Sequence, residues 1–300
     1  MTSTRPTRTW SLLAAGSGVV ALVVVGTVVA LGSSAEAAPT AVGLGTASSF
    51  AVLAGTTITN TGPTTITGDI GVSPGTAITG APKVSGSIHS ADAVALRAQN
   101  DLSTAYNTAA GAKPPTAISA DLVGMTLKPG VYNSASSVAL SGVLTLDAAG
   151  DPNAVWIFQA GSTLITASGS RVAMLNGAQA CNVYWQVGSS ATLGTGSTFK
   201  GTILALTSIT LTTAAKVDGR VLARNGAVTM DTNTITRSAC TTGTTAPTTR
   251  ASSSATSSSA TRPSTSSPSP ATNATPTATP TGRVTATPSG PVGTGDNSSG

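Results

Sequence analysis

Short apolar stretches recur along the middle of the chain at a nearly constant interval. Residues 202–205 and 220–223 lie 18 residues apart, and the similar stretch 183–186 precedes the first of them by 19. The same period returns nearer the N-terminus, at residues 50–52, 69–71 and 87–89. This period is too short for a helix pair or a propeller blade, and it is typical of one coil of a β-solenoid with three short strands. Glycines recur where the tight corners are expected, at Gly188, Gly201, Gly219 and Gly226.

The predicted strands fall into three sets, which we name face a, face b and face c. Strands of face a are apolar at consecutive positions, as in strands covered on both sides; they are 155–158, 183–187, 202–206 and 220–223. Strands of face b alternate, with large apolar residues inward and Thr, Ser or Ala outward; they are 57–59, 77–79, 163–165, 190–193, 208–212 and 227–230. Face c also alternates, but its outward positions include charged residues: Lys83, Arg171, Lys200, Lys216 and Asp218.

One long helix is predicted over residues 90–111. Ser90 is its expected N-cap, and Gly111 followed by Pro114 and Pro115 ends it. Its apolar side is Ala95, Ala98, Leu102, Ala105, Tyr106 and Ala109. A helix of about 20 residues spans ~30 Å, which matches six or seven strands stacked at ~4.8 Å. We therefore expect a mainly β protein, a three-faced β-solenoid with one long α-helix packed along face a.

Both ends of the chain differ from this middle part. Arg5 and Arg8 precede an apolar run over residues 12–31, and Ala35-Glu36-Ala37 has the pattern of a cleavage site. Residues 1–37 are therefore predicted to be a secretory signal peptide, so that the protein is secreted and begins at Ala38. The run is also near the length that spans a bilayer, so an uncleaved membrane anchor is the alternative.

The C-terminal segment, residues 241–300, consists mostly of Ser, Thr, Pro, Ala and Gly. Such a segment cannot bury enough apolar surface to fold, so it is predicted to be a disordered tail or stalk. A stalk is compatible with association with the cell surface. The folded domain is then residues 42–240.

The composition argues against most enzymes and against nucleic-acid binding. Only 8% of residues are charged and one His is present, so few groups titrate near neutrality. The acidic residues are scattered, and no cluster has metal-ligand spacing. The net charge of +5 includes Arg5, Arg8, Arg250 and Arg262, which lie outside the predicted domain, and aromatic stacking partners are scarce. We expect no catalytic residue, no metal, no cofactor, no small-molecule ligand and no nucleic-acid partner.

The two cysteines, Cys181 and Cys240, lie in a chain predicted to be exported, where a disulfide is plausible. Consecutive stacking of the coils would place them up to three strands apart, which is farther than a disulfide reaches. Pairing therefore requires a loop excursion near residues 176–182.

The outward residues of face b form an unusual surface, because they are nearly uncharged and rich in Thr. They are Thr57, Thr59, Thr79, Thr163, Ile165, Ser190, Thr192, Ser208, Thr210, Thr212 and Thr229. β-Branched side chains have restricted χ1 angles, so their methyls and hydroxyls are held in place. A flat face has no concavity for a small ligand, but it fits a flat, periodic partner such as ordered water at an ice surface. The alternative is a solvated face with no partner, since Thr is common on strands.

Residues 44–240 resemble the microbial ice-binding protein family. The matching segments are LGTASSFAVLAG (44–55), GDIGVSPG (68–75), DLSTAYNTAAG (101–111), LKPGVY (127–132), NAVWIFQAGSTL (153–164), NGAQACNVYWQVGSSATLGTGSTFKGTILA (176–205) and GRVLARNGAVTMDTNTI (219–235). The resemblance implies a discontinuous β-solenoid whose N-terminal coils stack out of chain order, with the helix as the long crossover. The residues alone suggest consecutive stacking. The resemblance also implies an ice-binding surface on the flat face that lacks the helix, with Thr192, Thr210 and Thr229 on it.

In the more active members of this family, a Thr-(Ala/Gly)-x-(Thr/Asn) pattern marks the corner after that face. Residues 76–79 and 195–198 match the pattern, whereas residues 213–216 depart from it at Lys216. Ile165, Gly194 and Asp231 interrupt the row of Thr residues.

These observations lead to one main prediction and two alternatives. The chain is predicted to be a secreted, monomeric, non-enzymatic protein that adsorbs to ice through face b and inhibits ice growth and recrystallisation. A cell-surface adhesion or matrix module with the same fold is the first alternative. A carbohydrate-binding solenoid is the second, but it would need exposed aromatic residues, and Trp156, Phe158, Tyr184 and Trp185 lie on strands predicted to be covered.

Overall fold

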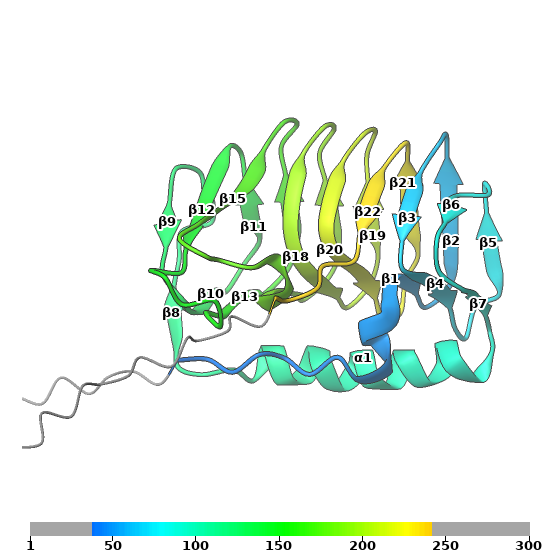
Figure 1. Cartoon of the computed structure of the whole chain (residues 1–300), viewed down its shortest axis with the longest axis horizontal. Helices are drawn as coiled ribbons and strands as arrows, with labels where there is room; N and C mark the ends of the chain where they lie inside the picture. The colour runs from blue at the N-terminus through cyan, green and yellow to red at the C-terminus, as the bar shows by residue number, and fades with distance from the viewer. Residues whose placement is uncertain (1–37, 242–300) are drawn as a thin grey trace, which may run out of the picture. The chain divides into compact units, whose positions relative to one another are not determined.

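A computed structural model of the chain describes residues 38–241, which coil into a three-faced parallel β-solenoid with one long helix beside it (Figure 1). The predicted signal peptide (1–37) and all of the predicted tail except Thr241 lie outside the described residues. No helix among the described residues is long and apolar enough to cross a membrane. The predicted fold class is confirmed.

A complete coil contributes one strand to each face. Face a contains β1 (Phe50–Ala54), β4 (Asp69–Val72), β7 (Ile88–Ser90), β8 (Pro115–Ala117), β10 (Gly130–Ser134), β13 (Trp156–Ala160) and β16 (Val183–Val187). Face b contains β2 (Thr57–Thr61), β5 (Ala77–Thr79), β11 (Val138–Leu140), β14 (Leu164–Thr166), β17 (Ala191–Leu193), β19 (Ile209–Leu211) and β21 (Val228–Asp231). Face c contains β3 (Thr65–Thr67), β6 (Lys83–Val84), β9 (Thr126–Leu127), β12 (Val143–Asp147), β15 (Arg171–Leu175) and β22 (Thr234–Thr236).

Two longer strands, β18 (Thr198–Ala205) and β20 (Lys216–Ala223), begin on face c and continue onto face a. They bend at Gly201 and Gly219, whose φ angles are 110° and 155°. The bend leaves no room for a side chain, since a Cβ on Gly219 would lie 1.8 Å from the carbonyl oxygen of Gly201. Glycine is therefore required at these corners.

The stacking order of the coils differs from their order in the chain. On face b the order is β11-β14-β17-β19-β21-β2-β5, so β2, from the N-terminal part, follows the C-terminal β21. The same junction joins β20 to β1 on face a and β22 to β3 on face c. The chain then crosses from the β7 end to the β8 end through α1 (Ala93–Ala110), which runs along face a (Figure 1). Consecutive stacking is wrong, and the order implied by the resemblance is confirmed.

Aromatic side chains stack inside the solenoid along neighbouring strands of face a. The rings of Phe158 and Trp185 lie 3.9 Å apart at an angle of 10°, and Tyr132 stacks on the other side of Phe158 at 5.5 Å. Every Phe, Tyr and Trp among the described residues is buried. Each contributes a large apolar area to the core, so the aromatic residues stabilise the coil and are not available on its surface.

The helix begins later than predicted, and Ser90 is not its cap. Ser90 ends β7 and donates a hydrogen bond to the Thr76 carbonyl oxygen at 2.6 Å. Because the edge strand extends to Ser90, the chain needs two more residues to turn, and the Asp92 carboxylate accepts from the Ala95 N–H at 2.8 Å as the N-cap. The six apolar residues predicted to face the solenoid are all buried.

The strands of face a also hold the helix by polar contacts. The Gln159 side-chain amide donates to the carbonyl oxygens of Ala109 and Ala112 at 2.9 and 3.0 Å, which satisfies free carbonyls at the helix C-terminus. Gln186 donates to the Tyr106 hydroxyl at 2.8 Å. These contacts fix the position of α1 along the stack, so that faces b and c remain uncovered.

The predicted disulfide between Cys181 and Cys240 is present, with a Cα–Cα distance of 5.4 Å. Cys181 lies in the short 3₁₀ helix η2 (Ala180–Asn182), in the loop before β16. Beside it, the Gln179 side chain accepts from the Thr241 N–H at 2.7 Å and donates to its carbonyl oxygen at 3.0 Å. The last described residues therefore return across the stack to this loop, which is the excursion that the pairing requires.

Candidate functional site

Five threonines stand in one outward row at the centre of face b. The strand register pairs Thr192 with Thr210, Thr210 with Thr229, Thr229 with Thr59, and Thr59 with Thr79. They therefore occupy five consecutive rungs, where a rung is one strand of the stack. Rungs are ~4.8 Å apart, so the row, which we call the central Thr row, is about 19 Å long.

Four of the five hydroxyls of the central Thr row are free to contact solvent. Among the described residues, those of Thr59, Thr192, Thr210 and Thr229 make no hydrogen bond to protein, and the Thr79 hydroxyl is 3.4 Å from the Ile58 carbonyl oxygen. Each side chain is β-branched and lies on a strand, so its χ1 angle is restricted. The backbone ladder fixes the spacing along the row, and the methyls and hydroxyls form a regular array.

The other predicted residues lie in rows on either side of the central Thr row. Thr57, Thr163, Ser190 and Ser208 stand at or just before the strand starts, and Thr212 follows β19. Four of these five hydroxyls, all but that of Thr57, hydrogen-bond within the protein. Thr163, for example, donates to the Ser137 hydroxyl at 2.8 Å, and Thr212 donates to the Leu193 carbonyl oxygen at 2.8 Å. The structure thus brings all eleven predicted residues to one face. Most hydroxyls of the central Thr row face solvent, whereas most hydroxyls beside it are hydrogen-bonded to the protein.

At the β11 end, the central row changes from threonine to apolar residues. The register continues from Thr192 to Ile165 and then to Ala139. Ile165 is 50% exposed. It borders a shallow hollow lined by Ala139, Leu140, Ser141, Ile165 and Ala167. Ile165 therefore shares the face but ends the hydroxyl array.

The corner after face b is built from residues with positive φ angles. These are Gly62, Ala81, Gly169, Gly196, Ala214 and Thr232. Backbone hydrogen bonds continue the ladder through the corner, from the Gly196 N–H to the Thr213 carbonyl oxygen and from the Ala214 N–H to that of Asp231. Residues 195–198 occupy this corner as expected. Residues 76–79 do not, since they overlap β5 on face b itself, and the corner of that coil is residues 80–83.

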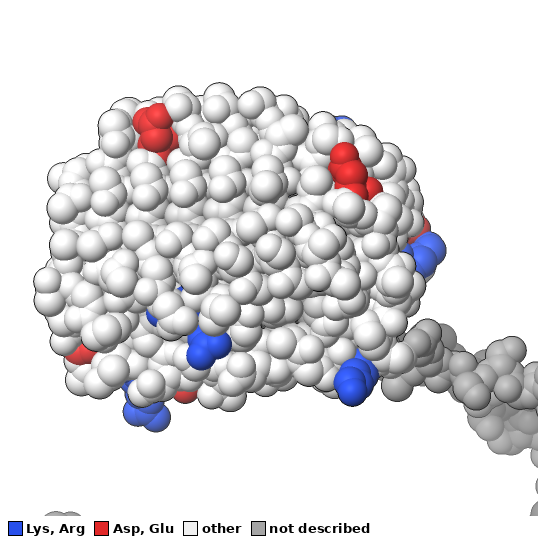
Figure 2. Space-filling view, turned by 180° about the vertical axis from the view of Figure 1, so that it is seen from behind, with Lys and Arg blue, Asp and Glu red and all other residues white. Residues whose placement is uncertain are grey.

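Charge is nearly absent from face b. Figure 2 looks onto the side opposite to that of Figure 1, and its charged residues lie at the margins of a broad uncharged surface. Among outward positions of the seven strands of face b, Asp231 is the one ionisable residue, and its carboxylate accepts from the hydroxyls of Thr213 and Thr232. The charged residues predicted for face c do lie on the strands of that face.

His89 and Asp147 hydrogen-bond neighbouring side chains of the solenoid. His89 hydrogen-bonds Asp92 at 2.7 Å beside the helix start. The Asp147 carboxylate accepts from Lys128, at 2.6 Å, and from Asn176, at 2.8 Å; these contacts lower its pKa to about 2. The described residues hold no group of three His, Cys, Asp or Glu arranged for a metal.

Comparison with known proteins identifies the architecture. A model of the ice-binding-like family matches residues 52–236 of the chain. An ice-binding protein of Nostoc sp. (strain HG1) is 57% identical over 203 residues, which cover 66% of this chain and 75% of the relative. One of Flavobacterium frigoris (strain PS1) is 38% identical over 215 residues, which cover 65% and 76%. This chain belongs to the ice-binding-like family.

Solved structures of ice-binding proteins have the same ice-binding-like fold. One from an Antarctic biological consortium has a TM-score of 0.67 and 50% identity, covering 68% of this chain and 94% of that chain. One from an Arctic yeast, described for its antifreeze activity, has a TM-score of 0.62 and 34% identity, covering 65% and 94%. The resemblance seen in the sequence is therefore confirmed.

In this ice-binding-like solenoid, the sequence predicted which residues lie on face b but not the order in which its rungs stack. The period of 18–19 residues placed Thr192, Thr210 and Thr229 on adjacent coils. The adjacency of Thr59 to Thr229 follows from the pairing of β2 with β21 at the junction, and the place of Ala139 at the far end follows from the pairing of β11 with β14. The sequence signal for Ala139 is weak, because β11 is only three residues long (Val138–Leu140).

Proposed function

We propose that this protein binds ice through face b, with the central Thr row as the contact. The observation that carries the proposal is the unbroken register of five outward threonines, four of whose hydroxyls make no hydrogen bond to the described protein, on a nearly uncharged face that the helix leaves bare. The names of its relatives as ice-binding proteins support it. Every Phe, Tyr and Trp among the described residues is buried, so face b offers no aromatic ring on which a sugar could stack.

The proposed mechanism needs no covalent chemistry. Methyls held at regular spacing order the adjacent water into a lattice-like layer, and the neighbouring hydroxyls anchor that layer by hydrogen bonds. Once the layer joins the ice, the front between bound molecules must grow with curvature, which lowers the local freezing point. Small crystals then stop exchanging mass with large ones, so recrystallisation is inhibited. The protein acts as a non-enzymatic monomer without a cofactor.

Export is part of the proposal. The sequence Ala35-Glu36-Ala37, which follows the apolar run, is the predicted cleavage site. A protein that meets growing ice outside the cell requires such a route, and the Ser/Thr/Pro-rich tail would permit association with the cell surface. The disulfide between Cys181 and Cys240 is consistent with an oxidising compartment.

The deciding experiment replaces central threonines by a larger side chain. Thr210→Tyr and Thr229→Tyr should each abolish most of the thermal hysteresis that the parent shows at equal concentration. The ring projects above the plane and separates the neighbouring rungs from the ice. Thermal melting, followed by circular dichroism, should hardly change because both hydroxyls face solvent.

Thr234→Tyr is the matched control, since Thr234 is an exposed outward threonine on β22 of face c. It should leave hysteresis unchanged. Equal inhibition by the parent and both face b variants would contradict the proposal. Loss in the Thr234 variant alone would move the contact to face c, and an inactive parent would favour the adhesion module.

A further inference from the structure

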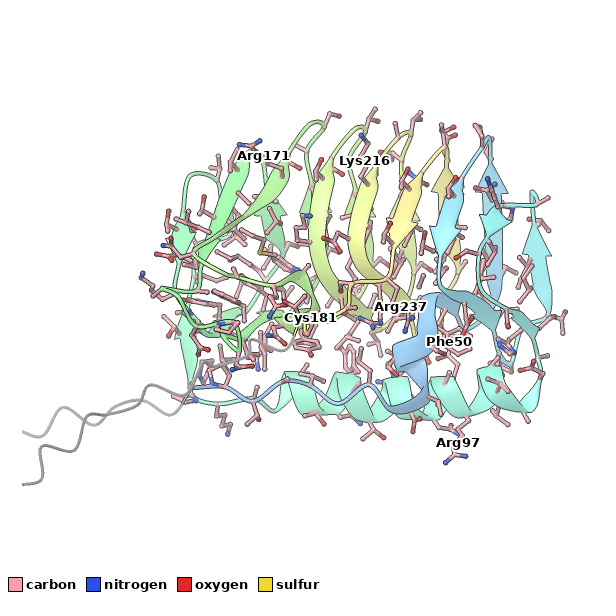
Figure 3. The ribbon with its side chains drawn as sticks, in the orientation of Figure 1. Phe50, Arg97, Arg171, Cys181, Lys216 and Arg237 are labelled. Carbon is pink, nitrogen blue, oxygen red and sulfur yellow. A yellow bond between two sulfur atoms is a disulfide. The ribbon has the colours of Figure 1, made fainter. Side chains whose placement is uncertain are left out.

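Face c presents a second ordered surface. Its net charge is positive, whereas that of face b is slightly negative. One outward row runs through Arg171, Thr198, Lys216, Thr234, Thr65 and Lys83, each paired with the next by the strand register. We call this the cationic row. Figure 3 looks onto this face, with Arg171 and Lys216 near the same edge of the sheet. Side chains at Arg171, Lys216 and Lys83 are exposed.

The cations of the row are separated by hydroxyls rather than by acids. Arg171 and Lys216 are two rungs apart, about 10 Å, and Lys216 and Lys83 are three rungs apart, about 14 Å. Threonines occupy every position between them. None of the three cations forms an ion pair within the described residues, whereas Lys200, in the adjacent row, pairs with Asp218 at 2.8 Å.

The charge is concentrated on this face. Its outward strand positions from β15 to β6 hold four cations (Lys83, Arg171, Lys200 and Lys216) and one carboxylate (Asp218), a net +3. The corresponding positions on face b hold only Asp231, a net −1. A flat sheet with aligned, unpaired cations at intervals attracts an extended anionic chain. Hydroxyls between the cations suit a partner rich in hydroxyls.

We propose that the cationic row binds a linear acidic polysaccharide, a chain of sugars carrying carboxylates. The carboxylates pair with Arg171, Lys216 and Lys83, and the sugar hydroxyls hydrogen-bond the threonines between them. Nucleic acid fits less well, because half of the positions in the row are threonines, which a sugar chain can hydrogen-bond but which leave a chain of phosphates without ion pairs. Faces b and c meet at one corner and point in different directions. A molecule held in an acidic matrix by face c therefore keeps face b open.

The test uses the full chain and sodium polygalacturonate as the probe, in affinity electrophoresis at low salt. The parent should be retarded, and the retardation should weaken as salt rises, because exposed ion pairs are screened. Arg171→Thr with Lys216→Thr should weaken binding about fivefold, as two exposed pairs are lost. The introduced threonines continue the row, so the fold should be kept, which circular dichroism checks.

The matched control is Arg97→Thr with Lys113→Thr, which removes the same charge from exposed positions on α1 and just beyond it. It should bind like the parent, and both double variants should keep the hysteresis of the parent. An unretarded parent overturns the proposal, and so does equal weakening in both double variants. Duplex DNA run in parallel decides the class of partner: binding of DNA as strong as that of polygalacturonate, and lost in the same variant, overturns the assignment to a polysaccharide.

Discussion

At the scale of single residues, the threonines of the central Thr row differ from those beside it on face b in whether their hydroxyls are bonded to the protein. The hydroxyls of Thr59, Thr192, Thr210 and Thr229 face solvent. Those of the flanking Thr163 and Thr212 donate hydrogen bonds to protein acceptors. Sequence alone cannot separate these two groups, because both read as outward threonines on alternating strands. The distinction comes from the register, which decides what lies beside each hydroxyl.

Ile165 tests whether the length of the hydroxyl array limits activity. Ile165→Thr would extend the central Thr row from five rungs to six, since Ile165 pairs with Thr192. We expect hysteresis at equal concentration to rise by roughly the added fraction of contact, one rung on five. Ile165 is 50% exposed, so the loss of its apolar contact should hardly lower the melting temperature.

Val143→Thr is the control for this gain. Val143 is an exposed outward residue of β12, paired with Arg171 on face c, and it undergoes the same change from an apolar β-branched residue to Thr. It should leave hysteresis as in the parent. A decrease in the Ile165 variant would instead mean that the apolar end contributes to the contact.

At the scale of elements, the sequence predicted the periodic parts and missed the junctions. The sequence located the strands with alternating polarity well, because every second side chain of such a strand must be apolar to enter the core. The helix start was wrong by three residues, since the length of the edge strand β7 decides where the turn falls. The corner assignment of residues 76–79 was wrong for a similar reason: a short motif matched in sequence while the register put it on a strand.

The hydrogen bonds of Asp147, which connect three neighbouring coils, predict that the stability of the protein depends on pH. Asp147, at the end of β12, joins Lys128 after β9 to Asn176 after β15, and its pKa is lowered to about 2 from 3.8. A carboxylate whose pKa is lower in the folded state stabilises the fold above its ordinary pKa, and this contribution is lost as the pH falls toward 2. We expect Asp147→Asn to melt at a lower temperature than the parent at pH 6.

The difference between the two melting temperatures should shrink as the pH falls from 4 toward 2, since a protonated Asp147 resembles the Asn. Asp92, Asp101 and Asp121 also have lowered pKa values, but they are present in both proteins and their effect cancels. A gap that stays constant from pH 6 to pH 2 would show that the carboxylate charge is not the cause.

At the scale of the whole described unit, the central Thr row is built from two parts of the chain that are distant in sequence. Thr59 and Thr79 come from before the helix, and Thr192, Thr210 and Thr229 come from after it. The junction is held by backbone pairing of β1 with β20 and by the buried Arg220, whose guanidinium donates to the Ser48 carbonyl oxygen at 3.1 Å and to that of Ser238 at 3.3 Å. Burial lowers the pKa of Arg220 to about 10, still well above neutrality, so these charged contacts persist.

The packing of this junction predicts that stability and ice binding fall together when it is loosened. Gly55 donates to the Gly226 carbonyl oxygen at 2.9 Å, and a Cβ on Gly55 would lie 2.4 Å from the carbonyl oxygen of Arg224. Gly55→Ala must therefore push the N-terminal coil away from β20 and β21, at a cost of about 1–3 kcal/mol. Both melting temperature and hysteresis should fall, because two of the five threonines leave the plane of the others. Gly43→Ala, where a Cβ would meet nothing within 4 Å, should change neither. Were hysteresis to survive in a destabilised but folded Gly55 variant, the contact would need only the three threonines that follow the helix.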